Sequence, residues 1–181
     1  MLLLHAALAV ALQPGVSPST PDLAAGQAAS GIACGYASLT ADERFMVGEA
    51  VLDTSTPMER KVAVGELVKQ AVDRCPSEVA SNDRRRRLAV AYAINQPIVE
   101  AADARLGGSA TIAGIWASLD QPRRDMIRQV RERGSTMTAD ESRSLLDPIL
   151  AAGVQRAVRE VSAALGGLKA FEQVHSIQAG W

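Results

Sequence analysis

The segment TPMERKVAVGELVKQAVDRCP, residues 56–76, decides the fold class of this chain. Apolar side chains at positions 64, 67, 68, 71, 72 and 75 recur at helical spacing, so they form one stripe along a helix. Thr56 and Glu59 have the spacing of a capping box, and Pro57 suits the first helical position. Pro76 prevents a simple continuation. The segment therefore predicts an amphipathic helix that ends at this second proline.

Helix start and stop signals recur over the rest of the chain, whereas alternation typical of a strand is absent. Aromatic residues make up only 3% of the sequence, so the core must consist of Ala, Val, Leu, Ile and Met side chains, which favour close helix packing. We expect an all-α protein: a single bundle of about six or seven helices. The predicted helices cover about residues 40–53, 56–75, 83–106, 112–119, 120–134, 138–165 and 168–181.

Three internal features refine this expectation. Pro97 is expected to kink or split the third helix. Gly166-Gly167 is expected to separate the last two helices. Apolar residues that step by four and three predict a seam for packing on another helix, and these are Val154, Val158, Val161, Leu165 and Leu168.

The N-terminal segment resembles an export signal. Residues 2–12 are apolar except for His5, and the run is too short to cross a bilayer. Ala9-Val10-Ala11 has the small-x-small pattern of a cleavage site, although no Lys or Arg precedes the apolar run. We expect a signal peptide at residues 1–11, a flexible Pro/Ser/Ala-rich leader at 12–37 and a helical domain at 38–181. The alternative is an apolar N-terminal helix packed on the domain.

The chain contains two cysteines, Cys34 and Cys75, and their spacing does not fit a metal site. In an exported protein two cysteines most simply form one disulfide. Cys75 continues the apolar stripe of its helix and should point inward, where a thiol is inert. We therefore expect a structural Cys34–Cys75 disulfide; the alternative is two buried free thiols in a cytosolic protein.

Arginine is concentrated in one part of the sequence. Net charge is −1 overall, but residues 38–83 carry −4 and residues 84–133 carry +5. Two helix faces could attract phosphate, lipid headgroups or another polyanion if they meet. The candidate anion-binding residues are Arg84, Arg85, Arg86, Arg87, Arg124, Arg128 and Arg131. The alternative is a solvated face offset by neighbouring acids.

Catalytic candidates are few. His175 is the one imidazole outside the predicted signal, which excludes a metal site with several histidines. Its place near a helix C-terminus already gives it a structural role. Asp140 and Glu141 begin a predicted helix after Thr138, where acidic side chains complement the helix dipole. The sequence contains no phosphate-binding loop, and it predicts no cofactor and no metal.

We expect an exported protein, periplasmic or secreted, that acts by binding or as an envelope accessory and not by catalysis. One alternative is a module that binds an anionic polymer or a membrane surface through the arginine-rich faces. Another is a hydrolase or transferase that uses Glu141 or His175. Sequence-specific nucleic-acid binding is not expected, because no interleaved aromatic residues or nucleic-acid motif accompany the arginines.

Overall fold

A computed structural model describes residues 31–181, and over this range every regular secondary-structure element is a helix. The all-α prediction is confirmed. The predicted signal peptide and most of the predicted leader lie outside the described residues. The elements are α1 (Cys34–Ala37), α2 (Ala41–Leu52), α3 (Met58–Asp73), α4 (Ser77–Ala80), α5 (Asp83–Arg105), α6 (Ile112–Ser118), α7 (Gln121–Glu132), α8 (Ala139–Ala151) and α9 (Val158–Gly180).

The described part of the chain thus has nine helices, more than the six or seven predicted. The two additional ones, α1 and α4, have four residues each. One helical turn is too short to produce a periodic apolar pattern, which is why the sequence did not reveal them.

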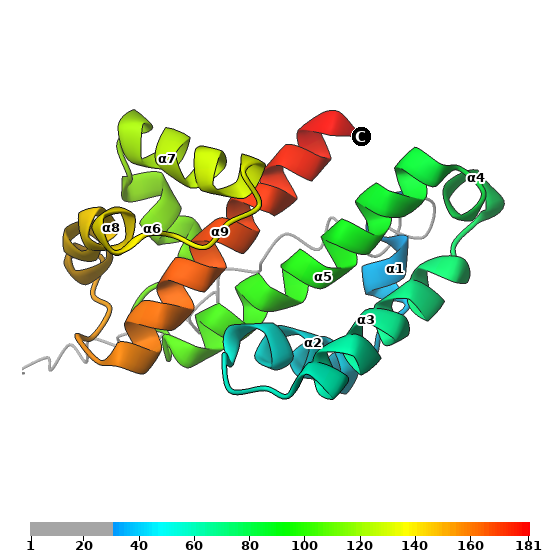
Figure 1. Cartoon of the computed structure of the whole chain (residues 1–181), viewed down its shortest axis with the longest axis horizontal. Helices are drawn as coiled ribbons and strands as arrows, with labels where there is room; N and C mark the ends of the chain where they lie inside the picture. Colours follow the sequence, from blue (N-terminus) through cyan, green and yellow to red (C-terminus); the bar gives the residue numbers. More distant parts are fainter. Residues whose placement is uncertain (1–30) are drawn as a thin grey trace, which may run out of the picture.

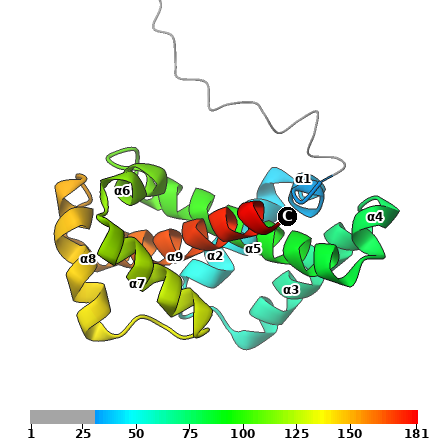
Figure 2. The same cartoon turned by 90° about the horizontal axis from the view of Figure 1, so that it is seen from above.

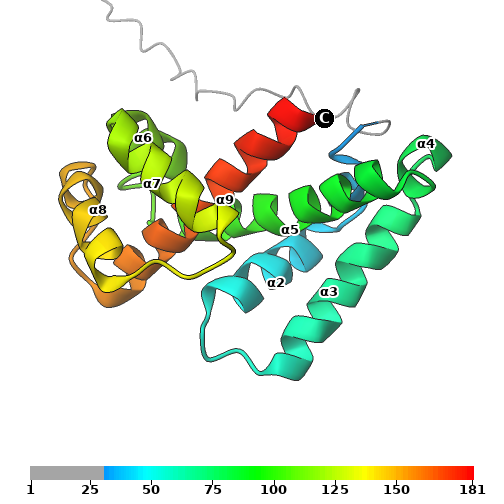
Figure 3. The same cartoon turned by 45° about the horizontal axis from the view of Figure 1, so that its top comes forward.

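The two longest helices, α5 and α9, form the centre of the fold (Figure 1). They run antiparallel, since Arg84 at the start of α5 donates a 3.0 Å hydrogen bond to the carbonyl of Gly180 at the end of α9. Helices α1 to α4 pack against α5, and α6 to α8 lie beside α9 (Figures 2 and 3). Two apolar cores result, and Ile94 of α5 packs against both.

Small side chains allow several helices to pack closely against α5. Its buried positions include four alanines, which bring other helices close. Of the kink or split expected at Pro97, the split does not occur: α5 continues through Pro97 to Arg105. The proline is fully buried and its carbonyl packs against Gly48 of α2. Tertiary packing therefore stabilises a continuous helix that the sequence alone disfavours.

The predicted break at Gly166-Gly167 was also wrong. Helix α9 runs through both residues, and the chain instead turns at Gly153, which has a φ of +96°. A β-carbon at Gly167 would lie 2.6 Å from Cδ1 of Ile112 and 2.7 Å from Cβ of Ala102. This glycine therefore permits close packing between helices and does not end one.

Part of the predicted helix-packing seam and one predicted N-terminal cap also differ from the structure. Val158 is 83% exposed, whereas Leu168 is fully buried. Val154 lies before α9, which begins at Val158, so the five seam positions do not share one continuous helical register. Thr56 does not cap α3, because Pro57 takes the N-cap position with extended backbone and no side-chain bond. The predicted capping box at Thr138 is confirmed, with its side-chain oxygen accepting from the Glu141 N–H.

The predicted disulfide is confirmed. Cys34 of α1 and Cys75, just after α3, are bonded, and both residues are buried. The bond joins positions 41 residues apart and connects the first described helix to the end of the third. Among residues 31–181, no helix is both long enough and apolar enough to cross a bilayer.

Candidate functional site: a cationic cleft along α5

The four consecutive arginines at the start of α5 face different neighbours. Arg84 bonds to the Gly180 carbonyl, and the guanidinium of Arg85 lies 5.7 Å from the ring centroid of Trp181. Arg86 donates two hydrogen bonds to Asp73 of α3, at 2.9 Å and 2.5 Å. The four side chains point in different directions because successive residues of a helix are rotated by about 100°. The run is therefore divided between the α9 terminus and α3, and does not form one patch.

Arg86 and Arg87 line a cleft of about 790 Å³. Residues from three helices meet there: Gly65 and Lys69 come from α3, and Gln173 comes from α9. The remaining lining residues belong to α5: Asp83, Arg86, Arg87, Val90, Ala91, Ile94 and Asn95. Such a volume lies within the range of small-molecule sites.

The lining has a cationic end and an apolar floor. Lys69, Arg86 and Arg87 supply three positive charges against the single negative charge of Asp83. Val90 and Ile94 form apolar surface one and two turns further along α5. This arrangement can bind a ligand with an anionic group at one end and apolar atoms behind it.

The three cations differ in how far they are already paired. Arg86 pairs with Asp73. Lys69 lies 3.6 Å from Glu66, and the side chains of Lys69 and Glu66 are each more than half exposed. Exposed pairs of this kind stabilise little and exchange readily. Arg87 has neither an ion pair nor a hydrogen bond within residues 31–181, so it is the cation most available to a ligand.

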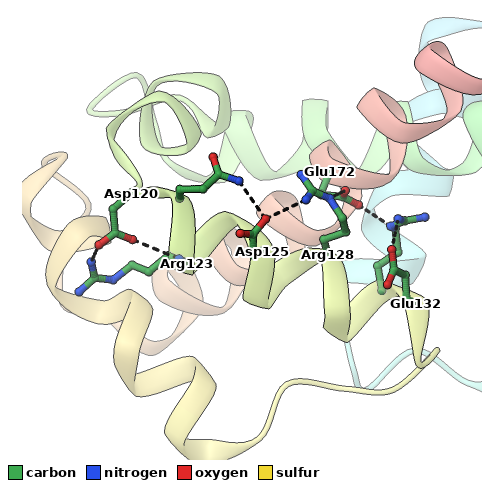
Figure 4. A network of polar contacts seen from close by, with 8 residues as sticks. Asp120, Arg123, Asp125, Arg128, Glu132 and Glu172 are labelled. Carbon is green, nitrogen blue, oxygen red and sulfur yellow. Dashed lines mark hydrogen bonds and ion pairs between the residues drawn. The ribbon is translucent and has the colours of Figure 1, made fainter.

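The second predicted basic face, on α7, is committed to internal pairs (Figure 4). Arg128 lies 2.8 Å from Asp125 and 3.4 Å from Glu172. Arg131 Nε lies 2.5 Å from Glu172 Oε2, an ion pair without the alignment of a hydrogen bond. Glu172 is 4% exposed and comes from α9. These contacts attach α7 to α9 and leave little free positive charge.

Arg124, the third arginine of this face, is likewise occupied. It donates a 2.9 Å hydrogen bond to the Ala117 carbonyl, and its guanidinium lies 5.8 Å from the Trp116 ring centroid. The two predicted basic faces also do not meet. The C-terminal half of α9 lies between α7 and the start of α5 (Figures 1 and 3).

Glu141 and His175, the predicted catalytic alternatives, both have structural partners. Glu141 accepts two hydrogen bonds from Arg133 and one from the backbone N–H of Thr138, which lower its pKa. His175 is exposed, and its ring packs edge-on against Phe171 with centroids 4.6 Å apart. Neither residue lines the cleft. These contacts account for Glu141 and His175 as structural residues.

A second polar cluster lies beside α1. Tyr36 donates a short hydrogen bond to Glu100, and the guanidinium of Arg44 lies 4.7 Å from the Tyr36 ring centroid. Burial, together with Glu100, raises the pKa of Tyr36 to about 12. All three residues line a cavity of about 250 Å³. Because the three side chains already engage one another, this cluster stabilises the junction of α1 with α5.

The sequence pattern did not reveal the part of the cleft supplied by α3 and α9. Gly65 was the one residue in that part whose type could have pointed to it. It lies inside an exposed stretch of α3, where glycine destabilises a helix by about 0.5–1 kcal/mol relative to alanine. A β-carbon there would meet nothing within 4 Å. No packing contact therefore requires this glycine, and the residue lies in the lining of the cleft.

Comparison with known proteins found no matching family model, no matching curated protein and no matching solved structure. The geometry of the cleft is therefore the basis for a functional proposal.

Proposed function

We propose that this chain is a non-catalytic binding protein, exported to the periplasm or secreted, whose cleft between α3, α5 and α9 binds a small anionic ligand. The observation that carries the proposal is the excess of cations at one end of a cleft with an apolar floor. An anion held there gains from several positive charges, while the apolar floor favours a ligand with a hydrocarbon or aromatic body.

Two features support export. The bonded cysteines are consistent with an oxidising compartment, because disulfides are rare where thiols are kept reduced. The apolar run at residues 2–12 has the length of a signal core. Intact mass of the protein from fractionated cells, prepared without reductant, tests both features. The expected mass is that of residues 12–181 with one disulfide; a reduced, full-length protein in the cytosol would contradict export.

Anion binding is tested with 8-anilinonaphthalene-1-sulfonate, a fluorescent anion with an apolar body. We expect saturable binding to one site on the oxidised full chain. Raising ionic strength from about 0.01 M to about 0.15 M shortens the screening length from about 30 Å to about 8 Å and should weaken binding. A flat dependence on salt would argue against recognition by charge.

Two variants with the same change in net charge locate the site. Arg87→Gln should weaken binding about two- to fivefold, as expected for one partly exposed charge. Arg143→Gln is the matched control, because Arg143 is 71% exposed on α8 and pairs with Asp140, away from the cleft lining. Equal effects of the two changes would mean that net charge, and not the cleft, attracts the dye.

A polyanion surface spanning both arginine-rich faces is not favoured. Arg128 and Arg131 are paired with acids, including the buried Glu172, and α9 separates the two faces. Likewise, no observation favours hydrolysis or group transfer by Glu141 or His175.

A further inference from the structure

The cleft continues into a second cavity along the same helix. Ile94 and Asn95 of α5 line both the 790 Å³ cleft and a neighbouring cavity of about 400 Å³. The second cavity lies between the end of α2, the middle of α5 and the first half of α9. Its apolar lining includes Val51, Leu52, Ile98 and Ala170. The two cavities thus adjoin at Ile94 and Asn95, and together they are called the groove.

This groove is polarised along its length. One end carries Lys69, Arg86 and Arg87, and the other end is formed largely by aliphatic side chains. The one cation at the apolar end, Lys169, donates a 2.8 Å hydrogen bond to the carbonyl of Ser135. Positive charge that is open to a ligand is therefore concentrated at the α5 N-terminal end.

The dimensions suit a single extended chain. Arg87 and Ile98 are eleven positions apart on α5, about 17 Å at about 1.5 Å per residue, roughly the length of an extended chain of a dozen carbon atoms. Val51, at the far end, is 44% exposed and would be covered by such a chain. Burial of its apolar surface would favour binding.

Gly65 marks an open part of the groove wall. It lies in the interior of α3, where a β-carbon would have no heavy atom within 4 Å, and it lines the cationic half of the groove. A larger side chain here would project into the groove without disturbing the core. A bulky residue at this position is therefore a direct probe of the groove.

We infer that the ligand is a single-chain anionic amphiphile, such as a fatty acid, with its charged head at Lys69 and Arg87 and its hydrocarbon chain along Ile94 and Ile98. This inference rests on the proposed function, because it specifies the ligand class of the same cleft. A ligand with a long chain uses both cavities, whereas a short anion uses only the first.

Calorimetric titration of the oxidised full chain tests the inference with three probes below their micelle-forming concentrations: octanoate, dodecanoate and dodecyltrimethylammonium. We expect affinity to rise about two- to fourfold per methylene from octanoate to dodecanoate, as burial of methylene groups predicts. Dodecyltrimethylammonium has the same chain but the opposite charge, and should bind at least about tenfold more weakly than dodecanoate.

Two variants place the chain within the groove. Gly65→Trp should reduce dodecanoate affinity at least about tenfold by filling the groove, while Ala63→Trp, an exposed position on the same helix outside the lining, should not. Val51→Asn should weaken dodecanoate about threefold or more and leave octanoate unchanged, because only the longer chain reaches it. Circular dichroism and thermal unfolding establish that each variant is folded.

The outcomes separate the two proposals. If octanoate and dodecanoate bind equally but Arg87→Gln weakens both, the cleft binds anions and the amphiphile inference is wrong. Equal binding of the cationic amphiphile would also overturn the inference. If no carboxylate binds and 8-anilinonaphthalene-1-sulfonate does not respond to Arg87→Gln, the proposed function fails as well.

Discussion

Arg131 of α7 lies 2.5 Å from the carboxylate of Glu172 of α9, a residue that is only 4% exposed. This pair explains why the arginines of α7 do not form an open anion-binding surface. Arg128 contacts the same carboxylate at 3.4 Å. The buried Glu172, which follows Arg128 by 44 residues in the sequence, thus pairs with both arginines.

Glu172→Gln should destabilise the protein by about 1–3 kcal/mol, because the amide keeps the volume but leaves two arginines without their buried counter-charge. Urea unfolding followed by circular dichroism measures the change. Asp140→Asn is the control, since its partner Arg143 and Asp140 itself are 71% and 89% exposed, and it should change stability by less than about 0.5 kcal/mol. Similar effects of both changes would contradict a stabilising role for Glu172.

Two glycine-to-alanine changes should have opposite signs. Gly48→Ala should destabilise by at least about 1–3 kcal/mol, because the new β-carbon would overlap the Pro97 carbonyl and lie 2.7 Å from Cβ of Ala101. Gly65→Ala should stabilise by about 0.5–1 kcal/mol, since it improves helix propensity in open space. Thermal and urea unfolding test both. Loss of stability in Gly65→Ala would show that α3 requires the glycine for packing.

Removing the disulfide should destabilise the fold by about 2–4 kcal/mol, because the bond closes a loop with a sequence separation of 41 residues. The Cys34→Ser, Cys75→Ser double variant and the reduced wild-type protein should show comparable losses in urea unfolding. An unchanged unfolding midpoint after reduction, with free thiols verified by mass, would show that the cross-link contributes nothing to stability.

Acid stability should depend on Glu49. Its carboxylate accepts hydrogen bonds of 2.9 Å and 2.6 Å from Arg105, and these bonds hold its pKa below the ordinary value of 4.5. A lowered folded-state pKa contributes stability above about pH 4.5, and this contribution is lost as pH falls through the folded-state value.

Urea unfolding of Glu49→Gln from neutral pH to below pH 4 measures this contribution. The difference from wild type should be full at neutral pH and should shrink in acid. A difference that stays constant across that range would mean that the loss is steric and not electrostatic.

The sequence predicted the long helices because their apolar spacing and caps are local properties. Thr138 and Glu141 form their capping box within one turn, so nothing distant can change it. The split considered at Pro97 and the break predicted at Gly166-Gly167 are absent for the opposite reason. Pro97 and Gly167 are helix breakers by propensity, but each lies at a helix contact whose partner is far away in sequence.

The candidate site was only partly predictable. Arg86 and Arg87 were identified from the sequence, but their roles depend on α3. That helix supplies Asp73, which pairs with Arg86, and Lys69, which lines the cleft together with Arg87. Gln173 arrives from α9 near the opposite end of the chain. No periodicity specifies which side chains meet across three helices.

We propose that the cleft between α3, α5 and α9 is the ligand site. The most direct test of this proposal is a titration of the isotopically labelled, oxidised full chain with 8-anilinonaphthalene-1-sulfonate, followed by backbone amide chemical shifts. We expect saturable shifts concentrated at Gly65, Arg87, Ile94 and Gln173. Shifts centred on α7 around Arg128, or scattered shifts that do not saturate, would contradict it.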